Sequence, residues 1–231
     1  MVKVISYNVH HFEGLDGEDK INLVAEYLQN NQADFVLFQE IDFSNSRSDF
    51  KDQLKIIAEL SRYEFSFAGK ILNYKDGYYG LGILSKHPIS NSKVVILPIL
   101  ATGMANDTLG GSHKVEQRGF MTLESVVEGR RIKIINSHFS MWSEERKDAF
   151  EKIKSEFTED FVIFAADFNT VDEREFKLLE KYKTQNFNTF QLPKPSKPID
   201  RFFVKGFKNF KTEVGSVNYS DHLPVILEVE F

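Results

Sequence analysis

Residues 161–169 read Phe-Val-Ile-Phe-Ala-Ala-Asp-Phe-Asn, an apolar run that ends in two polar side chains. An apolar run of this length is typical of a strand buried on both faces. Side chains two apart on a strand share a face, so Asp167 and Asn169 are expected to point into one cleft. Because ligand sites in α/β sheets gather at strand ends, this stretch is the first candidate site of the chain.

Other apolar segments end in the same way. Strands are expected at 2–7, 35–39, 130–137, 200–204 and 225–229, and each has a polar residue beside one end. These residues are Asn8, Glu40, His138, Asp200, Asp221 and His222. Each taken alone is more often a turn or capping residue than a ligand. Their recurrence at strand ends favours one shared site.

The remaining pattern predicts how these strands are connected. Apolar residues at helical spacing indicate helices near 21–28, 50–58, 143–157 and 170–179, with Ser143 capping the third and Thr170 and Glu173 forming a capping box for the fourth. Further strands are expected at 63–68, 79–85, 93–97, 120–127 and near Phe210, with a hairpin turn at Glu128-Gly129. Since helices interleave with hairpins, we expect mixed sheets, two of them packed face to face with helices outside. Residues 98–114 and 183–198 are expected to be loops.

Length and composition exclude several classes of protein. A chain of 231 residues favours a single domain spanning 1–231. The absence of cysteine excludes disulfides, Cys-ligated zinc, iron–sulfur clusters and thiol nucleophiles. No apolar run approaches the ~20 residues that a membrane span needs. A net charge of −5 does not suggest a strongly basic nucleic-acid binder, and no leader precedes Val2, so we expect a cytoplasmic monomer or a secreted form whose leader was removed.

The polar residue types favour one kind of chemistry. Carboxylates with asparagine and without cysteine suit hard divalent cations such as Mg²⁺, with Mn²⁺ or Ca²⁺ as alternatives. A His-Glu-x-x-His motif, a phosphate-binding glycine loop and a Gly-x-Ser-x-Gly elbow are all absent. A cation, an orienting carboxylate and two imidazoles suit the attack of water on a phosphate ester.

An ordered set of short motifs resembles the endonuclease/exonuclease/phosphatase superfamily, which includes deoxyribonucleases, neutral sphingomyelinases and inositol polyphosphate 5-phosphatases. The motifs are Ser6-Tyr7-Asn8, Gln39-Glu40, Gly80-Leu81-Gly82-Ile83-Leu84-Ser85, Asn136-Ser137-His138, Asp167-Phe168-Asn169, Ile199-Asp200 and Ser220-Asp221-His222-Leu223-Pro224. Each motif is weak alone, whereas the set in this order is specific. The resemblance implies an α/β fold, namely a four-layer α-β-β-α sandwich with the site at one edge of two mixed sheets.

The resemblance also implies a role for each residue. Asn8, Glu40 and Asp221 are similar to metal-site residues, with Glu40 the direct ligand. Asp167 resembles the residue that orients or deprotonates water, and Asn169 a phosphate or water contact. His222 resembles the histidine on the scissile phosphate, Asp200 its paired aspartate, and His138 the second active-site histidine. Arg118 stands where several nucleases carry a phosphate-contacting arginine.

Three positions stay open at this stage. The deoxyribonuclease branch has a glutamate that supports the first histidine, but residues 76–79 read Asp-Gly-Tyr-Tyr, so the partner of His138 is undetermined. His10 and His11 fit either the site or a surface turn. Trp142 fits a capping or core role better than stacking on a substrate.

The motifs indicate phosphoester hydrolysis but not the leaving group. A divalent-metal-dependent phosphodiesterase acting on DNA or RNA is the preferred interpretation. Cations and aromatic residues that would serve it are Lys70, Lys75, Tyr78, Tyr79, Lys114, Arg118, Lys194 and Lys197. A lipid or small-molecule phosphoesterase is the leading alternative, with the apolar segment 96–104 as a peripheral lipid contact. A non-catalytic phosphate-binding module on the same fold is the alternative of another class.

Overall fold

The computed structural model describes residues 1–100, 104–106, 112–191 and 196–231, with the backbone alone for 104–106 and 112–114. The helical elements are η1 (His10–Phe12), α1 (Ile21–Asn31), η2 (Ser46–Ser48), α2 (Gln53–Ser61), α3 (Ser143–Lys154) and η3 (Glu173–Leu179), where η denotes a 3₁₀ helix. The strands are β1 (Val2–Asn8), β2 (Phe35–Phe43), β3 (Phe65–Tyr74), β4 (Gly77–Ser85), β5 (Ser90–Ile96), β6 (Met104–Asn106), β7 (Ser112–Lys114), β8 (Gly119–Val127), β9 (Arg130–His138), β10 (Phe161–Asp167), β11 (Asp200–Lys205), β12 (Asn209–Val214) and β13 (Val225–Glu230).

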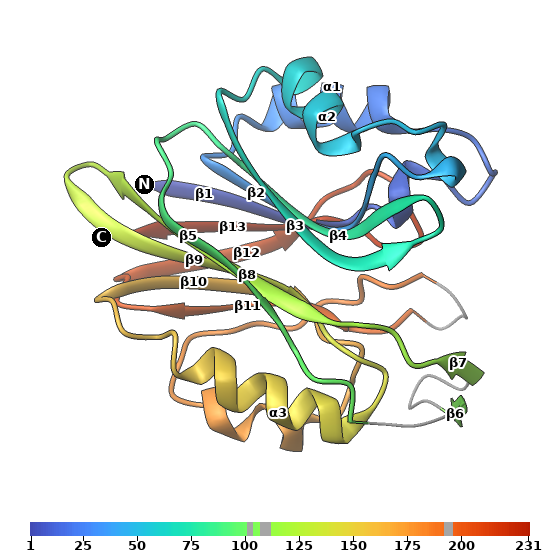
Figure 1. Ribbon diagram of the computed structural model, residues 1–231. Coiled ribbons are helices and arrows are strands. Elements are labelled where there is room, and N and C mark those ends of the chain that lie inside the picture. Colours follow the sequence, from blue (N-terminus) through green and yellow to red (C-terminus); the bar gives the residue numbers. More distant parts are fainter. Residues whose placement is uncertain (101–103, 107–111, 192–195) are drawn as a thin grey trace.

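Two sheets pack face to face between layers of helices (Figure 1). One has six strands in the order β12-β13-β1-β2-β4-β3, and the other has five in the order β11-β10-β9-β8-β5. Helices α1 and α2 cover the outer face of the first sheet, and α3 covers that of the second (Figure 1). The expected four-layer α-β-β-α sandwich is confirmed.

Both sheets are mixed, as the alternation of helices and hairpins predicts. β1 pairs with β2 in parallel, and β9 pairs with β10 in parallel. The β8–β9 pair is an antiparallel hairpin whose turn residues Glu128 and Gly129 have φ of 50° and 74°. Two consecutive positive φ values match the right-handed twist of the strands, which explains the glycine at the second position.

Three apolar clusters hold the layers together. One lies between the sheets, one joins α1 and α2 to the six-stranded sheet, and one joins α3 and η3 to the five-stranded sheet. The last contains many of the phenylalanines, including Phe139, Phe150, Phe164 and Phe168, with ring centroids 4.7–6.2 Å apart. Burying each such side chain stabilises the fold by roughly 1.5–3 kcal/mol, so the abundance of Phe serves the core.

A polar bridge crosses the inter-sheet layer near one end. Gln39 of β2 donates from Nε2 to Asn136 Oδ1 of β9 at 2.8 Å, and both residues are fully buried. Asn136 Nδ2 in turn donates to the carbonyls of Phe38 and Gly82 at 2.9 and 3.2 Å. These hydrogen bonds join the two sheets at that end, although the buried Gln39 Oε1 has no partner among the described residues.

The structure corrects several expected helix starts. Phe50 does not belong to α2: its φ is 56° and it is 61% exposed, and Asp52 caps the helix by accepting from Lys55 N at 3.1 Å. Ser143 is the first residue of α3, and no side chain caps that helix. The Thr170 capping box is wrong as well, because Asp172 caps η3 by accepting from Arg174 N. Thr170 also accepts a backbone hydrogen bond, from Asp172 N at 3.1 Å, so spacing alone does not decide which of the two side chains begins the helix.

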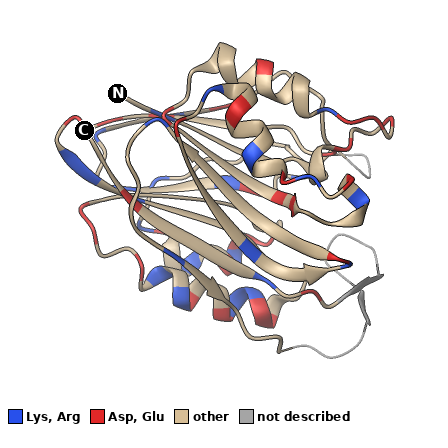
Figure 2. Ribbon diagram, turned by 45° about the horizontal axis from the view of Figure 1, so that its top comes forward, with Lys and Arg blue, Asp and Glu red and all other residues tan. Residues whose placement is uncertain are grey.

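The two expected loops are described in part. Segment 98–114 contains the short pair β6–β7, while 101–103 and 107–111 lie outside the described residues. In 183–198, Lys194 lies outside them too. Within the described chain, none of the helices has both the length and the apolar character needed to cross a bilayer. Acidic and basic residues are interspersed along the helices rather than gathered on one face in the view of Figure 2.

Candidate active site

Three neighbouring strands bring polar side chains to one end of the five-stranded sheet. In the register of β9, β10 and β11, Asp167 lies beside His138 on one side and beside Asp200 on the other. β1 ends at Asn8, at the end of the sandwich opposite the chain termini (Figure 1). The topology therefore makes neighbours of residues that are far apart in the sequence.

Asn8 connects the two sheets at this end. Its Nδ2 donates to Glu40 Oε1 and to Asp167 Oδ2, each at 2.9 Å, while its Oδ1 accepts from His10 N at 3.1 Å. Asn8 is fully buried, whereas the Glu40 side chain is 19% exposed. The amide thus holds two carboxylates from different sheets side by side, and only Glu40 of the two carboxylates reaches the surface appreciably.

His222 forms a buried pair with Asp200. Its Nδ1 lies 2.7 Å from Asp200 Oδ2, and the Thr189 hydroxyl donates to the same oxygen at 2.6 Å. The carboxylate fixes the ring with a proton on Nδ1, so that Nε2 faces Asp167 Oδ2 at 3.6 Å. Burial alone would lower the pKa of His222, but Asp200 and Asp167 raise it to about 10. The imidazole is therefore a cation at neutral pH.

Asp167 has an unusual affinity for a proton. Burial and the neighbouring Asp200 carboxylate raise the pKa of Asp167 to about 7, against the opposing effects of His222 and the Asn8 hydrogen bond. Its Oδ1 accepts from the Asn169 backbone N–H at 3.0 Å. A carboxylate with a pKa near neutrality suits the acceptance of a proton from water.

The hydrogen-bond partner of the His138 ring is Arg118. Residue Gly119 pairs with His138 across β8 and β9, which places the preceding Arg118 with Nη1 3.0 Å from His138 Nδ1. Because a guanidinium only donates, Nδ1 accepts, and the neutral ring carries its proton on Nε2, 3.5 Å from Asp167 Oδ2. Burial lowers the pKa of His138 well below its usual value, and Arg118 lowers it further. Where a glutamate was sought, the sequence has Tyr79, which lines the same cleft.

The Ser-Asp-His motif before β13 is hydrogen-bonded to the end of the first strand, β1. The Ser220 hydroxyl lies 2.9 Å from the Asn8 carbonyl oxygen and 3.1 Å from Asp221 Oδ1, and its oxygen accepts from His222 N at 3.3 Å. Asn169, past the end of β10 with φ of 50°, donates from Nδ2 to Phe139 O at 2.9 Å. One serine thus positions the backbone that carries both Asp221 and His222.

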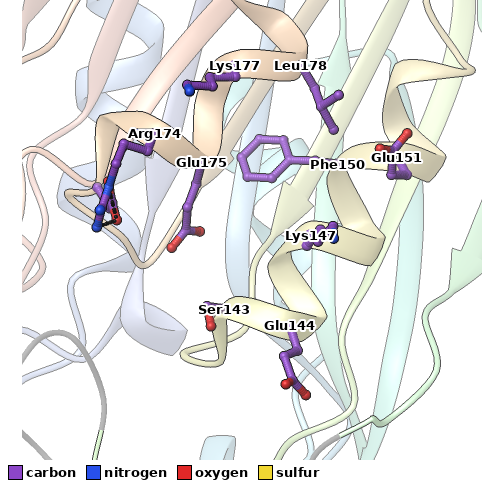
Figure 3. A pocket seen from close by; sticks show the side chains of 10 residues that line it. Ser143, Glu144, Lys147, Phe150, Glu151, Arg174, Glu175, Lys177 and Leu178 are labelled. Carbon is purple, nitrogen blue, oxygen red and sulfur yellow. Dashed lines mark hydrogen bonds and ion pairs between the residues drawn. The ribbon is translucent and has the colours of Figure 1, made fainter.

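These groups open into a cleft of about 330 Å³. Its lining contains His10, Glu40, Arg47, Tyr74, Tyr79, Glu116, Arg118, His138, Met141, Asp167, Asn169, Phe190, Asp221 and His222. All of the site residues predicted from the sequence lie in this lining or, for Asn8 and Asp200, are hydrogen-bonded directly to it. A second hollow of about 500 Å³ lies between α3 and η3 and is rimmed by exposed charged side chains such as Lys147, Glu151 and Lys177 (Figure 3).

The donor set fits a hard divalent cation. Ligand atoms of Glu40, His138 and Asp167 lie within 4.8 Å of one another, and Asp221 lines the same cleft. Burial would raise the pKa of Glu40, but the Asn8 hydrogen bond and the cationic His222 hold it below its usual value, so this carboxylate is ionised and available. Anionic oxygen donors at a solvent-accessible edge are the ligands that Mg²⁺, Mn²⁺ and Ca²⁺ prefer.

Several residues that line or support the cleft were not predicted from the sequence. Arg47 and Tyr74 line the cleft, and Thr189 supports Asp200 from a segment expected to be only a loop. One available signal was Asp42, a carboxylate inside an apolar strand that needs a cationic partner. His10 lines the cleft, His11 lies beside it in a hollow with Gln53 and Lys51, and Trp142 precedes α3 without joining the cleft.

Comparison with known proteins agrees with this geometry. The sequence matches the endonuclease/exonuclease/phosphatase family over residues 5–222. The chain belongs to this family. Members are hydrolases that act on phosphoesters, so the cleft lies on a fold used for that chemistry. No curated protein sequence matches the chain.

Solved structures show the same fold at low identity. A family member from Beutenbergia cavernae superposes with a TM-score of 0.79 at 19% identity, covering 100% of this chain and 71% of that one. A mannosyl-6-phosphatase from Bacteroides thetaiotaomicron gives 0.74 at 18% identity, covering 100% of both chains. TDP2 from D. rerio, complexed with a single-strand DNA product, gives 0.72 at 16% identity, covering 100% of this chain and 99% of that one.

Proposed function

We propose that this chain is a divalent-metal-dependent phosphodiesterase that cleaves nucleic acid by in-line attack of water at the cleft. The observation that carries the proposal is the convergence of Glu40, His138, Asp167 and His222 at one solvent-accessible edge, with Asn8 holding the two carboxylates together. Such a set of buried groups with shifted pKa values is typical of a catalytic site.

Glu40 would hold the cation, with Asp221 as a further carboxylate in reach of the cleft. A bound Mg²⁺ supplies charge neutralisation at the phosphate oxygens. Arg118 also lines the cleft and is aligned by His138 and by Glu116, whose Oε2 lies 3.1 Å from Arg118 Nη2. Its guanidinium is placed to donate to a nonbridging phosphate oxygen.

The remaining residues divide the proton transfers between them. Asp167, with its raised pKa, orients the attacking water and accepts its proton. His222 stays cationic through its bond to Asp200 and donates a hydrogen bond from Nε2 to the charge that develops on the phosphate. As the bond from phosphorus to the leaving oxygen breaks, that oxygen takes a proton from water. His138 remains neutral and presents Nε2–H to the same oxygens without competing for the proton.

The walls of the cleft favour a nucleic-acid substrate. Arg47 and Arg118 line the cleft together with Tyr74 and Tyr79. The two tyrosine ring centroids lie 4.4 and 5.2 Å from Arg47 Cζ. Interleaved cations and aromatic rings are the recurring features of sites for single-stranded nucleic acid. TDP2, which shares the fold, binds a single-strand DNA product, and this supports the same class of substrate.

A panel of substrates tests the proposal. We expect Mg²⁺- or Mn²⁺-dependent hydrolysis of bis-(p-nitrophenyl) phosphate and of single-stranded DNA or RNA, with little release of phosphate from p-nitrophenyl phosphate. Lys177→Ala, in the hollow between α3 and η3, is the matched control and should retain wild-type rates. Turnover confined to a monoester would contradict phosphodiester specificity, and binding without any turnover would support a non-catalytic module instead.

One observation favours a lipid phosphoester as the second candidate. Ile96, Ile99 and Leu100 are 49–51% exposed where the chain leaves β5, beside Arg118, whose carbonyl accepts from Leu97 N at 2.9 Å. Exposed aliphatic side chains next to an active site suit contact with a membrane surface. Hydrolysis of sphingomyelin in vesicles at a higher rate than of single-stranded DNA would establish this candidate over the first.

A further inference from the structure

Arg47 forms a bidentate ion pair with the fully buried carboxylate of Asp42. Its Nε and Nη2 donate to Asp42 Oδ2 and Oδ1 at 2.9 and 2.6 Å. The Asp42 carboxylate is fully buried, whereas the Arg47 side chain is 20% exposed. Nη1 of Arg47 has no hydrogen-bond partner among the residues that the structure describes. The buried member is therefore the anion, and the cation faces the cleft.

Two other ion pairs have the opposite arrangement. Arg146 is fully buried against Glu175, and Arg201 is 1% exposed against Glu173, which is 61% exposed. In these pairs the carboxylate faces solvent and the guanidinium is enclosed, as expected of pairs that serve packing. Burying a carboxylate under an exposed guanidinium instead holds a cation in place without consuming all of its donors.

Aromatic rings restrict the Arg47 guanidinium further. Its Cζ lies 4.4 Å from the centroid of Tyr74 and 5.2 Å from that of Tyr79. Tyr79 pairs with Asp42 across β2 and β4 and with Leu72 across β3 and β4, so that Asp42 and Tyr79 share a face of the sheet. A guanidinium fixed on three sides loses little rotational freedom when it binds an anion.

The position of Arg47 distinguishes it from Arg118. Arg118 is bonded to His138 and lies beside the carboxylates on which hydrolysis depends, whereas Arg47 has no such bond to a described catalytic residue. The two guanidinium groups line one cleft: Arg47 lies in η2, which follows β2 of the six-stranded sheet, and Arg118 directly precedes β8 of the five-stranded sheet. If the reacting phosphate binds at the carboxylates, as proposed above, Arg47 is a second cation in the same cleft and can bind a second anion.

We propose that Arg47, held by Asp42 and stacked on Tyr74, forms a subsite for a second phosphate group of the substrate. This inference rests on the proposed function, in which the first phosphate of the substrate is the one hydrolysed at the carboxylates. Two sources share this chemistry: the adjacent phosphate of an oligonucleotide, and the second phosphate of a doubly phosphorylated sugar. The donor of the new bond is Arg47 Nη1, and Asp42 acts as a positioning residue.

Calorimetric binding of matched ligand pairs in Mg²⁺ tests the subsite. One pair is thymidine 5′-monophosphate and thymidine 3′,5′-bisphosphate; the other is fructose 6-phosphate and fructose 1,6-bisphosphate. In the wild-type protein we expect the second phosphate to tighten binding on the order of tenfold in one of the pairs, as a hydrogen bond to a charged group does. The pair that shows the gain identifies the source of the phosphate.

Variants of Arg47 decide whether the gain belongs to this residue. Arg47→Ala should abolish the gain while leaving the monophosphate within about twofold, and Arg47→Lys, which keeps the charge, should retain part of it. Arg174→Ala removes an exposed arginine that forms a comparable bidentate pair with Asp172 and should change nothing. Thermal unfolding of each variant checks the fold, and Arg47→Lys carries the test if Arg47→Ala does not fold.

Two results would overturn the subsite. One is an equal loss of affinity for the one-phosphate and two-phosphate ligands, which would make Arg47 only a support of the cleft. The other is no gain from a second phosphate in either pair. The calorimetry does not depend on turnover, so the two proposals are tested separately. A negative binding result would leave the proposed hydrolysis untouched. If the protein proved not to hydrolyse phosphodiesters, the difference in affinity between the ligands could still be measured.

Discussion

The hollow between α3 and η3 and the cleft at the strand ends differ in the chemistry that their side chains can support. The first is larger, about 500 against 330 Å³, and has an apolar floor that includes Phe150 (Figure 3). Its charged side chains, such as Lys147, Glu151 and Lys177, are solvent-exposed. The cleft encloses buried titratable groups whose neighbours shift the pKa of each. Chemical capacity therefore follows the burial of polar groups rather than the size of the hollow.

The comparison predicts its largest effect for substitutions at the centre of the cleft. Asp167→Ala removes the proton acceptor and His222→Ala the cationic donor, so each should lower kcat on the order of 10²-fold or more. Steady-state kinetics on a phosphodiester substrate measure the loss. Lys147→Ala, in the larger hollow, should stay within about twofold of wild type. Near-native turnover of either cleft variant would remove the basis of the role assignment.

The second-largest difference between the two regions should be the effect of a substitution on Mg²⁺ affinity. Glu40→Gln removes an anionic ligand, so the Mg²⁺ concentration for half-saturation should rise by about tenfold or more, since even outer-shell changes cost that much. Calorimetric titration with Mg²⁺ measures this in the absence of substrate. Glu151→Gln is the matched control at the larger hollow. An unchanged titration for Glu40→Gln would place the cation elsewhere.

For the free energy of unfolding we expect the opposite order, with the larger effect from a substitution at the hollow between α3 and η3. Phe150 is 1% exposed and packs against Phe139, Phe168 and Phe176. Phe150→Leu loses these ring contacts and should lower the free energy of unfolding by about 1–1.5 kcal/mol, with kcat unchanged. Denaturant unfolding measures the change, and Phe50→Leu, at a residue 61% exposed, is the control. A clear fall in kcat under conditions where the Phe150→Leu variant remains folded would indicate that the larger hollow takes part in catalysis.

The smallest effect concerns an ion pair remote from the cleft. Burial would raise the pKa of Glu156, but the bonds from Lys93 and Lys133 lower it below its usual value of 4.5. The pair's contribution, up to about 1 kcal/mol, is therefore present above pH 4.5 and is lost as pH falls through the lower folded-state pKa. Urea unfolding of wild type and Glu156→Gln should differ at pH 7 and converge in acid. A difference that grows in acid would contradict this sign.

The sequence was sufficient for features governed by local rules. Apolar runs with terminal polar residues located the strands that carry Asn8, His138 and Asp167, and a Glu-Gly pair located the β8–β9 turn. Helix starts were harder, because Thr170 and Asp172 each accept from the backbone amide two residues ahead, and only Asp172 begins η3. These local alternatives differ by little free energy, and tertiary packing decides between them.

Features that depend on strand register lay beyond the sequence. Arg118 reaches His138 only because Gly119 pairs with that histidine across two strands. Arg47 reaches the cleft because Asp42, five residues earlier, is buried and draws the guanidinium back over Tyr74. The first contact depends on how separate strands align, and the second on the path of the chain from β2 into η2, so neither follows from spacing alone.

The rate of bis-(p-nitrophenyl) phosphate hydrolysis as a function of Mg²⁺ concentration, in wild type and in His222→Ala, tests most directly whether the buried cluster at the strand ends is a hydrolytic centre. The account predicts wild-type turnover that requires the cation and a loss on the order of 10²-fold in the variant at saturating Mg²⁺. Turnover that needs no cation, or that survives the removal of the imidazole, would contradict it.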